Sequence, residues 1–331
     1  MEYRCLGRTG VKVSALCLGC LTFGREIGET ASQEIIARYL EAGGNFLDTA
    51  NVYSRGRSEE IVGTAIRGHR EEIVLATKVG QRMGDGRNEV GLSRKHIMCQ
   101  IDESLRRLQT EYIDLYYLHC WDDKADMRDT LRAMDDLVRV GKIRGWGVSN
   151  FAGWQMALAM GIVEREELAQ PVAVQPQYSL IVRDIEREVL PAAVAFGLAV
   201  VPWSPLARGL LSGKYRRGQL PPENSRFRRS ITWQDAWQRW DRERNWRTIE
   251  AVGAIAEARR KTYAQVALNW LLHRPGITGP VIGATSLEQL EDNLETVGWE
   301  LTPEEMAQLD EASVFELGYP YEFIQVIGRD R

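Results

Sequence analysis

The stretch "NFLDTANVYSRGRSEEIVG", residues 45–63, places an aspartate inside an apolar run and a tyrosine five positions later. Residues 45–50 have the length and the bounding turn residues of a short buried strand, and residues 58–68 have the pattern of a helix. A buried carboxylate at Asp48 is costly without a counter-charge. Either a cation therefore lies close to Asp48, or the segment is not a strand.

The same unit, a strand followed by a helix, recurs along the chain. Between the strands lie helical patterns, for which Ser93, Asp129 and Ser286 are expected as N-caps. The alternation predicts a parallel sheet, and a count of eight strands favours a closed (β/α)8 TIM barrel of the α/β class. An open doubly wound sheet is the alternative, although the chain has neither a GxGxxG after a strand nor a GxxxxGK[ST] motif. The expected strands are 14–20, 45–50, 73–80, 112–119, 143–150, 172–179, 198–206 and 279–285, and the helices include 32–43, 58–68, 93–109, 129–142, 184–197 and 286–296.

Three features complete the expected architecture, a single domain over residues 1–331. Residues 3–16 alternate around "RTG", which predicts an N-terminal β-hairpin before the barrel. Residues 205–246, after the seventh strand, are too long for an ordinary barrel loop, and long insertions at the carboxyl ends of barrel strands usually cover a site. The apolar tail around residues 315–328 is expected to dock on the barrel.

Composition excludes several classes of function. A net charge of −4 argues against a general binder of nucleic acid or membrane surfaces, and no apolar stretch is long enough to span a bilayer. The odd count of five cysteines and the absence of a leader sequence favour free thiols in a reducing cytoplasm, and we expect no metal.

Four polar residues are expected to converge at one mouth of the barrel. Asp48 closes the second strand, Lys78 lies near the end of the third, and His119 ends the fourth. In a parallel barrel the carboxyl ends of these strands meet, together with Tyr53 from the adjoining loop. Lys78 would pair with Asp48 and lower the pKa of the Tyr53 phenol, so that Tyr53 could donate a proton. Taken singly, each residue is better explained by a structural role, as part of a buried ion pair or as a core histidine; the four together indicate chemistry.

These residues resemble the aldo-keto reductases, NADPH-dependent carbonyl reductases built on a (β/α)8 barrel. The resemblance is carried by "YRCLGRTGVKVSALCLG", "FLDTANVYSRGRSEEIVG", "LATKVG", "GKIRGWGVSNF", "WSPLARGLLSGKY" and "VIGATSLEQLEDNL". It implies that Tyr53 is the general acid, that Asp48 and Lys78 tune it, and that His119 positions the carbonyl. The chain looks most similar to the branch that contains the voltage-gated potassium channel beta subunits and many bacterial reductases.

The resemblance also implies an NADPH/NADP+ site. Ser149, Asn150 and Gln175 match positions that bond the nicotinamide carboxamide, and Trp203 matches the aromatic that stacks on its ring. Lys214 and Arg226 match the positions that contact the 2'-phosphate. The full set of implied cofactor residues is Gly19, Cys20, Leu21, Ser149, Asn150, Gln175, Trp203, Ser204, Pro205, Leu206, Gly209, Leu211, Lys214, Arg226, Gly283, Thr285, Gln289, Asp292 and Asn293.

Departures from the family pattern concern the substrate pocket. Cys20 and Leu21 stand where relatives often have threonine and tryptophan, and Cys120 and Trp121 follow the histidine. The expected pocket residues are Leu21, Tyr53, Cys120, Trp121, Tyr319 and Tyr321.

A tryptophan stripe lies outside these motifs. Trp233, Trp237 and Trp240 have the spacing of one helical face, which we interpret as packing on the barrel in preference to a lid or a partner surface.

The expected function is reduction of a small aldehyde or ketone, such as a sugar, by hydride transfer. The alternatives are a cofactor-binding regulatory subunit with little turnover, and oxidation of a sugar or an alcohol by the same path. The sequence leaves the oligomeric state open.

Overall fold

The computed structural model of the chain describes residues 1–223, 225–229 and 237–328. It opens with the predicted hairpin, in which β1 (Tyr3–Cys5) pairs antiparallel with β2 (Lys12–Ser14). Gly7 lies in the hairpin loop with a φ of +55°, and a Cβ there would come within 2.6 Å of the Val172 carbonyl oxygen. Only glycine fits at this point, which brings the hairpin against the amino-terminal end of the barrel.

Eight parallel strands form the barrel that the sequence predicts. Their order in the sheet is β10-β3-β4-β5-β6-β7-β8-β9. Two backbone hydrogen bonds join the outer edges, because the Thr278 N–H donates to Val200 and the Val281 N–H to Pro202, each at 2.8 Å. The strands are β3 (Cys17–Gly19), β4 (Phe46–Asp48), β5 (Val74–Val79), β6 (Ile113–Leu118), β7 (Ile143–Ser149), β8 (Ala173–Gln175), β9 (Ala199–Val200) and β10 (Val281–Ile282).

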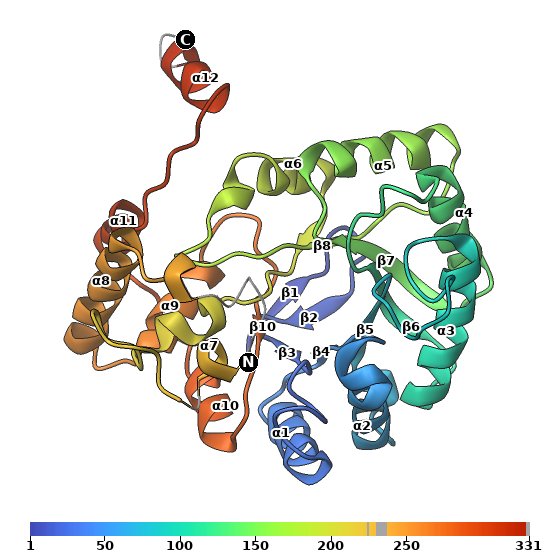
Figure 1. Cartoon of the computed structure of the whole chain (residues 1–331), viewed down its shortest axis with the longest axis horizontal. Coiled ribbons are helices and arrows are strands. Elements are labelled where there is room, and N and C mark those ends of the chain that lie inside the picture. The colour runs from blue at the N-terminus through green and yellow to red at the C-terminus, as the bar shows by residue number, and fades with distance from the viewer. Residues whose placement is uncertain (224, 230–236, 329–331) are drawn as a thin grey trace.

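Helices surround the strands (Figure 1). Ser93 and Ser286 cap α3 and α10 as predicted, but Asp129 is not an N-cap. Asp126 takes that position in α4 and accepts from the Arg128 N–H at 2.9 Å, because the helix begins one turn earlier than the apolar pattern indicates. The helices are α1 (Glu29–Glu41), α2 (Arg57–Ala65), α3 (Arg94–Leu108), α4 (Met127–Arg139), α5 (Gly153–Arg165), α6 (Val189–Phe196), α7 (Arg226–Arg229), α8 (Glu243–Arg259), α9 (Tyr263–Leu272), α10 (Leu287–Leu294), α11 (Pro303–Ala312) and α12 (Tyr321–Gly328).

The core has two parts because side chains alternate between the two faces of each strand. Phe46, Ala76 and Leu115 belong to a cluster inside the barrel. Leu47 and Leu75 belong to a larger cluster between the strands and the helices. Burial on both faces explains why the strands read as continuous apolar runs, and why a charged residue among them is informative.

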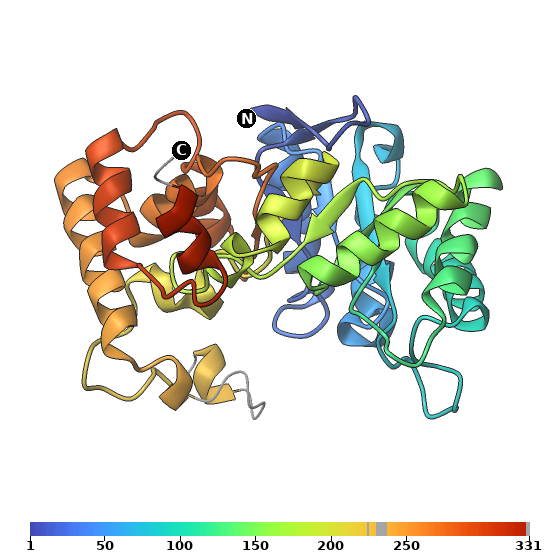
Figure 2. The ribbon, with the colours of Figure 1, turned by 90° about the horizontal axis from the view of Figure 1, so that it is seen from above.

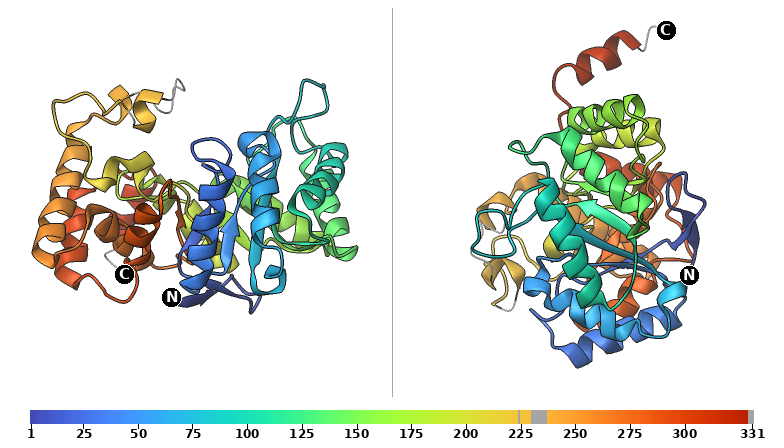
Figure 3. Two further views of the ribbon diagram at one scale, coloured as in Figure 1. Left: turned by 90° about the horizontal axis from the view of Figure 1, so that it is seen from below. Right: turned by 90° about the vertical axis from the view of Figure 1, so that its right-hand side faces the viewer.

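The two ends of the barrel differ. Figure 2 and the left panel of Figure 3 show the hairpin at one end and the segment after β9 at the other, together with the loop after β5. This second end is the one at which the carboxyl ends of the strands lie, so the long segment is on the expected side.

The C-terminal tail differs from expectation. Helix α12 stands apart from the barrel in Figure 1 and in the right panel of Figure 3, and none of its residues is buried. Phe323 and Val326 are 59% and 67% exposed. The expectation that the tail docks on the barrel is therefore wrong for this helix, whose apolar side chains find no partner face within the described part of the chain.

The tryptophan stripe falls on irregular backbone. Trp233 lies outside the described residues, and Trp237 belongs to a short 3-10 helix. Trp237 stacks on Tyr215 with ring centroids 5.6 Å apart, and Trp240, 9% exposed, lies 5.7 Å from Phe227. The two described tryptophans pack on the core, in agreement with the interpretation made from the sequence.

All five cysteines are free, as expected. Cys17 and Cys20 have the CxxC spacing, but both are fully buried at the start of the barrel. Of the helices in the described part of the chain, none has the length and apolar character that a membrane crossing requires.

Candidate active site

The carboxyl ends of β4, β5 and β6 bring three of the predicted residues together. Asp48 pairs with Ala76, Lys78 pairs with Tyr117, and the His119 N–H donates to the Val79 carbonyl at 2.8 Å. Asp48, Lys78 and His119 are 2%, 0% and 6% exposed. Parallel register alone therefore places these side chains at one mouth of the barrel.

Lys78 is the cation that Asp48 requires. Its Nζ binds Asp48 Oδ1 in a short ion pair, and also donates to the Thr49 carbonyl at 2.8 Å. Asp48 Oδ2 accepts from Gln175 Nε2 at 2.8 Å. The predicted pairing is confirmed, whereas the contact with Gln175 was not foreseen, because sequence reasoning gave this amide only to the cofactor.

Tyr53 reaches the same pair from the loop after β4. Its hydroxyl oxygen lies 3.3 Å from Lys78 Nζ, and its ring meets His119 edge to face with centroids 5.9 Å apart. The two residues after it, Ser54 and Arg55, have positive φ angles of 50° and 55°, followed by Gly56 at 94°. Left-handed backbone at non-glycine residues is unfavourable and concentrates at functional sites. The turn therefore fixes the direction of Tyr53 at an energetic cost.

Burial determines how these groups ionise. Burial raises the pKa of Tyr53, and the nearby Lys78 charge offsets this only in part. The sequence-based expectation of a lowered phenol pKa is thus wrong for the protein without bound ligand, because desolvation outweighs the cation. Burial also lowers the pKa of His119 well below its usual value, with the Lys78 charge acting in the same direction. At neutral pH Tyr53 holds its proton and His119 is neutral.

Burial alone would lower the pKa of Lys78, but the Asp48 carboxylate, and after it Tyr53, raise it. The ammonium therefore keeps its charge at neutral pH although it is fully buried. A charged lysine beside a protonated phenol can stabilise negative charge that develops on the phenol oxygen.

A second buried ion pair supports this geometry. Glu59 is fully buried, accepts from Thr77 Oγ1 and from Arg107 Nε, both at 2.6 Å, and so anchors α2 next to Lys78. A Cβ on Gly56 would come within 2.7 Å of Arg107 Cδ. The glutamate was not singled out from the sequence, since "SEE" reads as an exposed first turn of a helix.

A chain of hydrogen bonds links His119 to Trp203 across the mouth. Asn150 Nδ2 donates to the His119 carbonyl at 2.8 Å and to Ser149 Oγ at 3.0 Å. Trp203 Nε1 donates to Asn150 Oδ1 at 3.1 Å, and Ser149 Oγ donates to the Gln175 carbonyl at 2.8 Å. Ser149, Asn150, Gln175 and Trp203, all predicted to hold the nicotinamide, thus form one connected rim.

The backbone after Trp203 is strained. Ser204, Ala207 and Arg208 have φ angles of 56°, 48° and 60°, and Gly209 follows at 89°. The segment Ala207–Ser212 is a 3-10 turn broken by these angles. Three non-glycine residues in the left-handed region within five positions indicate a functional segment, because such backbone strain clusters at active sites and ligand-binding loops.

Lys214 and Arg226 lie close together on the same segment. Burial, and after it the Arg226 charge, lowers the pKa of Lys214. Arg226 Nη2 lies 3.2 Å from Glu26 Oε1 in the loop after β3. Two adjacent cations with one carboxylate leave an excess positive charge, which suits an anion.

The predicted adenosine-end residues lie at β10 and the start of α10. Gln289 Oε1 accepts from Thr285 N and Oγ1, both at 3.0 Å, and Asn293 Nδ2 donates to the Gly283 carbonyl at 3.3 Å. A Cβ added at Gly283 would meet nothing within 4 Å, so this edge is open. Asp292 instead accepts from Gln265 Nε2 at 2.9 Å.

The predicted substrate-pocket residues are only partly brought together. Trp121 follows His119 at the mouth and packs edge to face on Phe151 and Trp154, with centroids 5.3 and 5.4 Å away. Tyr319 is 86% exposed, and the Tyr321 hydroxyl bonds Glu188 at 2.5 Å at the base of the projecting α12. The structure does not bring these two tyrosines to the group formed by Asp48, Tyr53, Lys78 and His119. Leu21 and Cys120 are half-buried.

Known proteins resemble this chain over most of its length. Residues 15–314 match the model of the aldo/keto reductase family. The chain is 38% identical to the uncharacterized oxidoreductase YrpG of Bacillus subtilis, over 94% of this chain and 95% of that protein. It is 36% identical to a probable voltage-gated potassium channel subunit beta of Arabidopsis thaliana (90% and 91%), and 32% identical to the versiconal hemiacetal acetate reductase of Aspergillus parasiticus (97% and 100%).

Proposed function

The chain belongs to the aldo/keto reductase family of oxidoreductases, and on that premise we propose that it reduces an aldehyde or ketone to the alcohol with NADPH. The observation that carries the proposal is the contact set of Lys78, which reaches both the Asp48 carboxylate and the Tyr53 hydroxyl from a fully buried position. An ion pair that served stability alone would not require a tyrosine held there by a strained turn.

Proton transfer falls to Tyr53. Its phenol is protonated at neutral pH, so it is ready to donate to a carbonyl oxygen placed between it and His119. As the proton leaves, the Lys78 ammonium at 3.3 Å stabilises the phenolate, and Asp48 holds that ammonium in place. His119, neutral and rigidly packed, can bond the carbonyl oxygen without competing as an acid.

The residues present fit NADPH, a nicotinamide adenine dinucleotide phosphate. The Asn150–Trp203 rim offers polar groups and a half-exposed indole for the nicotinamide, the strained turn after Trp203 lies beside it, and Lys214 with Arg226 offers two cations to a 2'-phosphate. The buried Nδ1 of His119 has no hydrogen-bond partner among the described residues, as expected of a group facing a ligand. When bound, NADPH supplies the hydride.

The experiment that tests this proposal is a turnover assay with a panel of aldehydes, ketones and sugars, following NADPH oxidation. Turnover of at least one compound with kcat/KM in the ordinary enzymatic range, on the order of 10⁴ M⁻¹ s⁻¹ or above, supports a reductase. Tight NADPH binding without turnover on any member would favour a different function.

Similarity to proteins named as potassium channel beta subunits favours a second candidate, a cofactor-binding regulatory subunit. The exposed apolar α12 adds a surface through which a partner could bind. The complete Asp48, Tyr53, Lys78 and His119 set speaks for turnover, in either the reductive or the oxidative direction. Co-purification with and without residues 316–331, together with the turnover assay, separates the two.

A further inference from the structure

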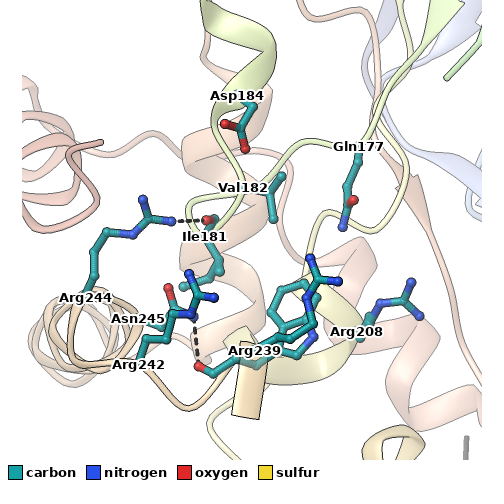
Figure 4. Close-up of a pocket in the computed structure, with 10 residues that line it drawn as sticks. Gln177, Ile181, Val182, Asp184, Arg208, Arg239, Arg242, Arg244 and Asn245 are labelled. Carbon is teal, nitrogen blue, oxygen red and sulfur yellow. Dashed lines mark hydrogen bonds between the residues drawn. The ribbon is translucent and has the colours of Figure 1, made fainter. Parts of the chain in front are cut away.

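A cavity of about 290 Å³ lies between the loop after β8 and the segment that leads into α8. Figure 4 shows its lining. Four of the lining residues are arginines: Arg208, Arg239, Arg242 and Arg244. This cavity is separate from the Lys214–Arg226 pair, since neither residue lines it.

Basic side chains outnumber acidic ones among the described residues that line this cavity. Asp184 is its one acidic lining residue within the described part of the chain, and Asp184 Oδ1 already accepts from Arg187 Nη1 at 2.7 Å. Arg244 Nη2 donates to the Ile181 carbonyl at 2.9 Å, and this neutral acceptor does not compensate the guanidinium charge. Arg242 has no ion pair with any residue that the structure describes. Guanidinium groups gathered around a concave space favour an oxyanion.

The acidic neighbours of these arginines in the chain are engaged elsewhere. Asp241 Oδ1 accepts from Trp246 Nε1 at 2.7 Å, and Glu243 Oε1 lies 3.2 Å from Arg217 Nη2. Neither Asp241 nor Glu243 lines the cavity, and among the described residues neither forms an ion pair with Arg242 or Arg244.

The start of α8 adds backbone donors to the same place. Arg242 is the N-cap of this 17-residue helix and makes no side-chain capping bond, so the first amides of α8 lack the usual acceptor. Arg244 and Asn245, in the first turn, also line the cavity. A helix amino terminus carries partial positive charge and unpaired N–H groups, both of which favour an anion.

Asn245 independently indicates a ligand. It is 3% exposed, and its Nδ2 donates to the Trp240 carbonyl at 2.8 Å. Its Oδ1 is buried and has no hydrogen-bond partner among the described residues. A buried acceptor of this kind is normally satisfied, and a hydroxyl on a bound molecule would do so.

We propose that this cavity is an accessory binding site for a small phosphate ester that carries a hydroxyl group. Arg242, Arg244 and the uncapped start of α8 take the phosphate, and Asn245 Oδ1 accepts from the hydroxyl. Gln177, which also lines the cavity, pairs with Trp203, and the Arg208 N–H donates to Ser204 Oγ at 3.2 Å. A ligand here therefore contacts the two strand ends that carry the proposed nicotinamide rim, without occupying it.

Binding is measured by calorimetric titration of the full chain, first without cofactor and then saturated with NADP+, so that in the second titration the cofactor phosphates occupy their own site. The probes are inorganic phosphate, methyl phosphate and 2-hydroxyethyl phosphate. We expect 2-hydroxyethyl phosphate to bind more tightly than methyl phosphate, by roughly fivefold or more for one added hydrogen bond. Equal binding of the two esters would overturn the role of Asn245, and loss of all binding on NADP+ saturation would assign the phosphate to the cofactor site.

Two double variants with the same change of net charge test the arginines. Arg242→Gln with Arg244→Gln should weaken 2-hydroxyethyl phosphate binding by about tenfold or more, since each removes a charge-assisted contact. Arg216→Gln with Arg217→Gln, exposed on the same segment but outside the cavity, should change it less than about twofold, as expected for screened charges. Equal weakening in both would reduce the effect to general electrostatics and overturn the site. Gln177→Glu places a carboxylate in the cavity and should also weaken binding; unchanged affinity there would contradict the location. NADPH affinity and melting temperature, unchanged in each variant, show that the fold is intact.

Discussion

Lys78→Met tests the energetic cost of breaking the buried Asp48–Lys78 pair. The substitution keeps most of the side-chain volume but removes the cation from a fully buried position, leaving the Asp48 carboxylate with Gln175 Nε2 at 2.8 Å as its remaining side-chain donor. Breaking a buried pair from one side costs about 3–5 kcal/mol. At an unfolding entropy of ~2.1 cal/mol/K per residue, the 331 residues give ~0.7 kcal/mol/K, so the melting temperature should fall by about 4–7 °C.

The matched control is the double variant Lys78→Met with Asp48→Asn, which removes the stranded charge while keeping an oxygen for Gln175 to bond. Its melting temperature should recover by several degrees relative to the single variant, because the main cost is an unpaired charge and not lost packing. Thermal unfolding followed by circular dichroism, with chemical denaturation as a second measurement, gives both values. An unchanged melting temperature in the single variant, or a double variant no more stable than the single, would refute the reasoning.

Three further outcomes follow from the site. Lys214→Met with Arg226→Ala should lower the preference for NADPH over NADH by about two to four orders of magnitude, because two charge-assisted contacts of ~1.5–3 kcal/mol each are lost. Dissociation constants for both cofactors check this, and an unaltered preference would place the 2'-phosphate elsewhere. Cofactor binding should quench tryptophan fluorescence, and Trp203→Ala should remove part of the quench; full quenching in the variant would move the stacking role to another residue. The pKa of His119 is lowered in the folded protein, so the unfolded chain binds a proton at this histidine at a higher pH than the folded chain does. This residue therefore lowers the free energy of unfolding by up to about 1.4 kcal/mol per pH unit as the pH drops below about 6.5. His119→Gln should flatten that part of the curve of stability against pH, and identical curves for wild type and variant would contradict a buried neutral imidazole.

The barrel was predictable because its signals are periodic. Apolar runs buried on both faces, bounded by turn residues, identify strands without any knowledge of their partners. The strands β9 (Ala199–Val200) and β10 (Val281–Ile282) are shorter than expected. The sequence shows how far the apolar run extends, whereas the length of a strand is set by the backbone hydrogen bonds that it forms with its neighbours. Likewise, the apolar tail was expected to dock because its composition shows hydrophobicity but not the availability of a complementary face.

Within the candidate site, the pairing of charged residues was easier to predict than the net pKa shift of Tyr53. That Asp48 needed Lys78 followed from burial and charge alone. The ionisation of Tyr53 could not be predicted in this way, because its pKa depends on whether desolvation or the Lys78 ammonium has the larger effect. Only the folded structure shows both the burial of the phenol and its distance from the ammonium. The contact of Gln175 with Asp48 and the buried Glu59–Arg107 pair join residues far apart in the chain, which a single sequence cannot pair.

The account rests on Tyr53 as the proton donor, and Tyr53→Phe tests this most directly. Single-turnover reduction of a substrate found in the carbonyl panel, with NADPH in excess, should slow by about 10²–10⁴-fold or more, since general acid catalysis contributes that range. The dissociation constant for NADPH should stay within about twofold of wild type, because the removed hydroxyl contacts Lys78 and no proposed cofactor residue. A variant that turns over within a few fold of wild type would contradict the central claim.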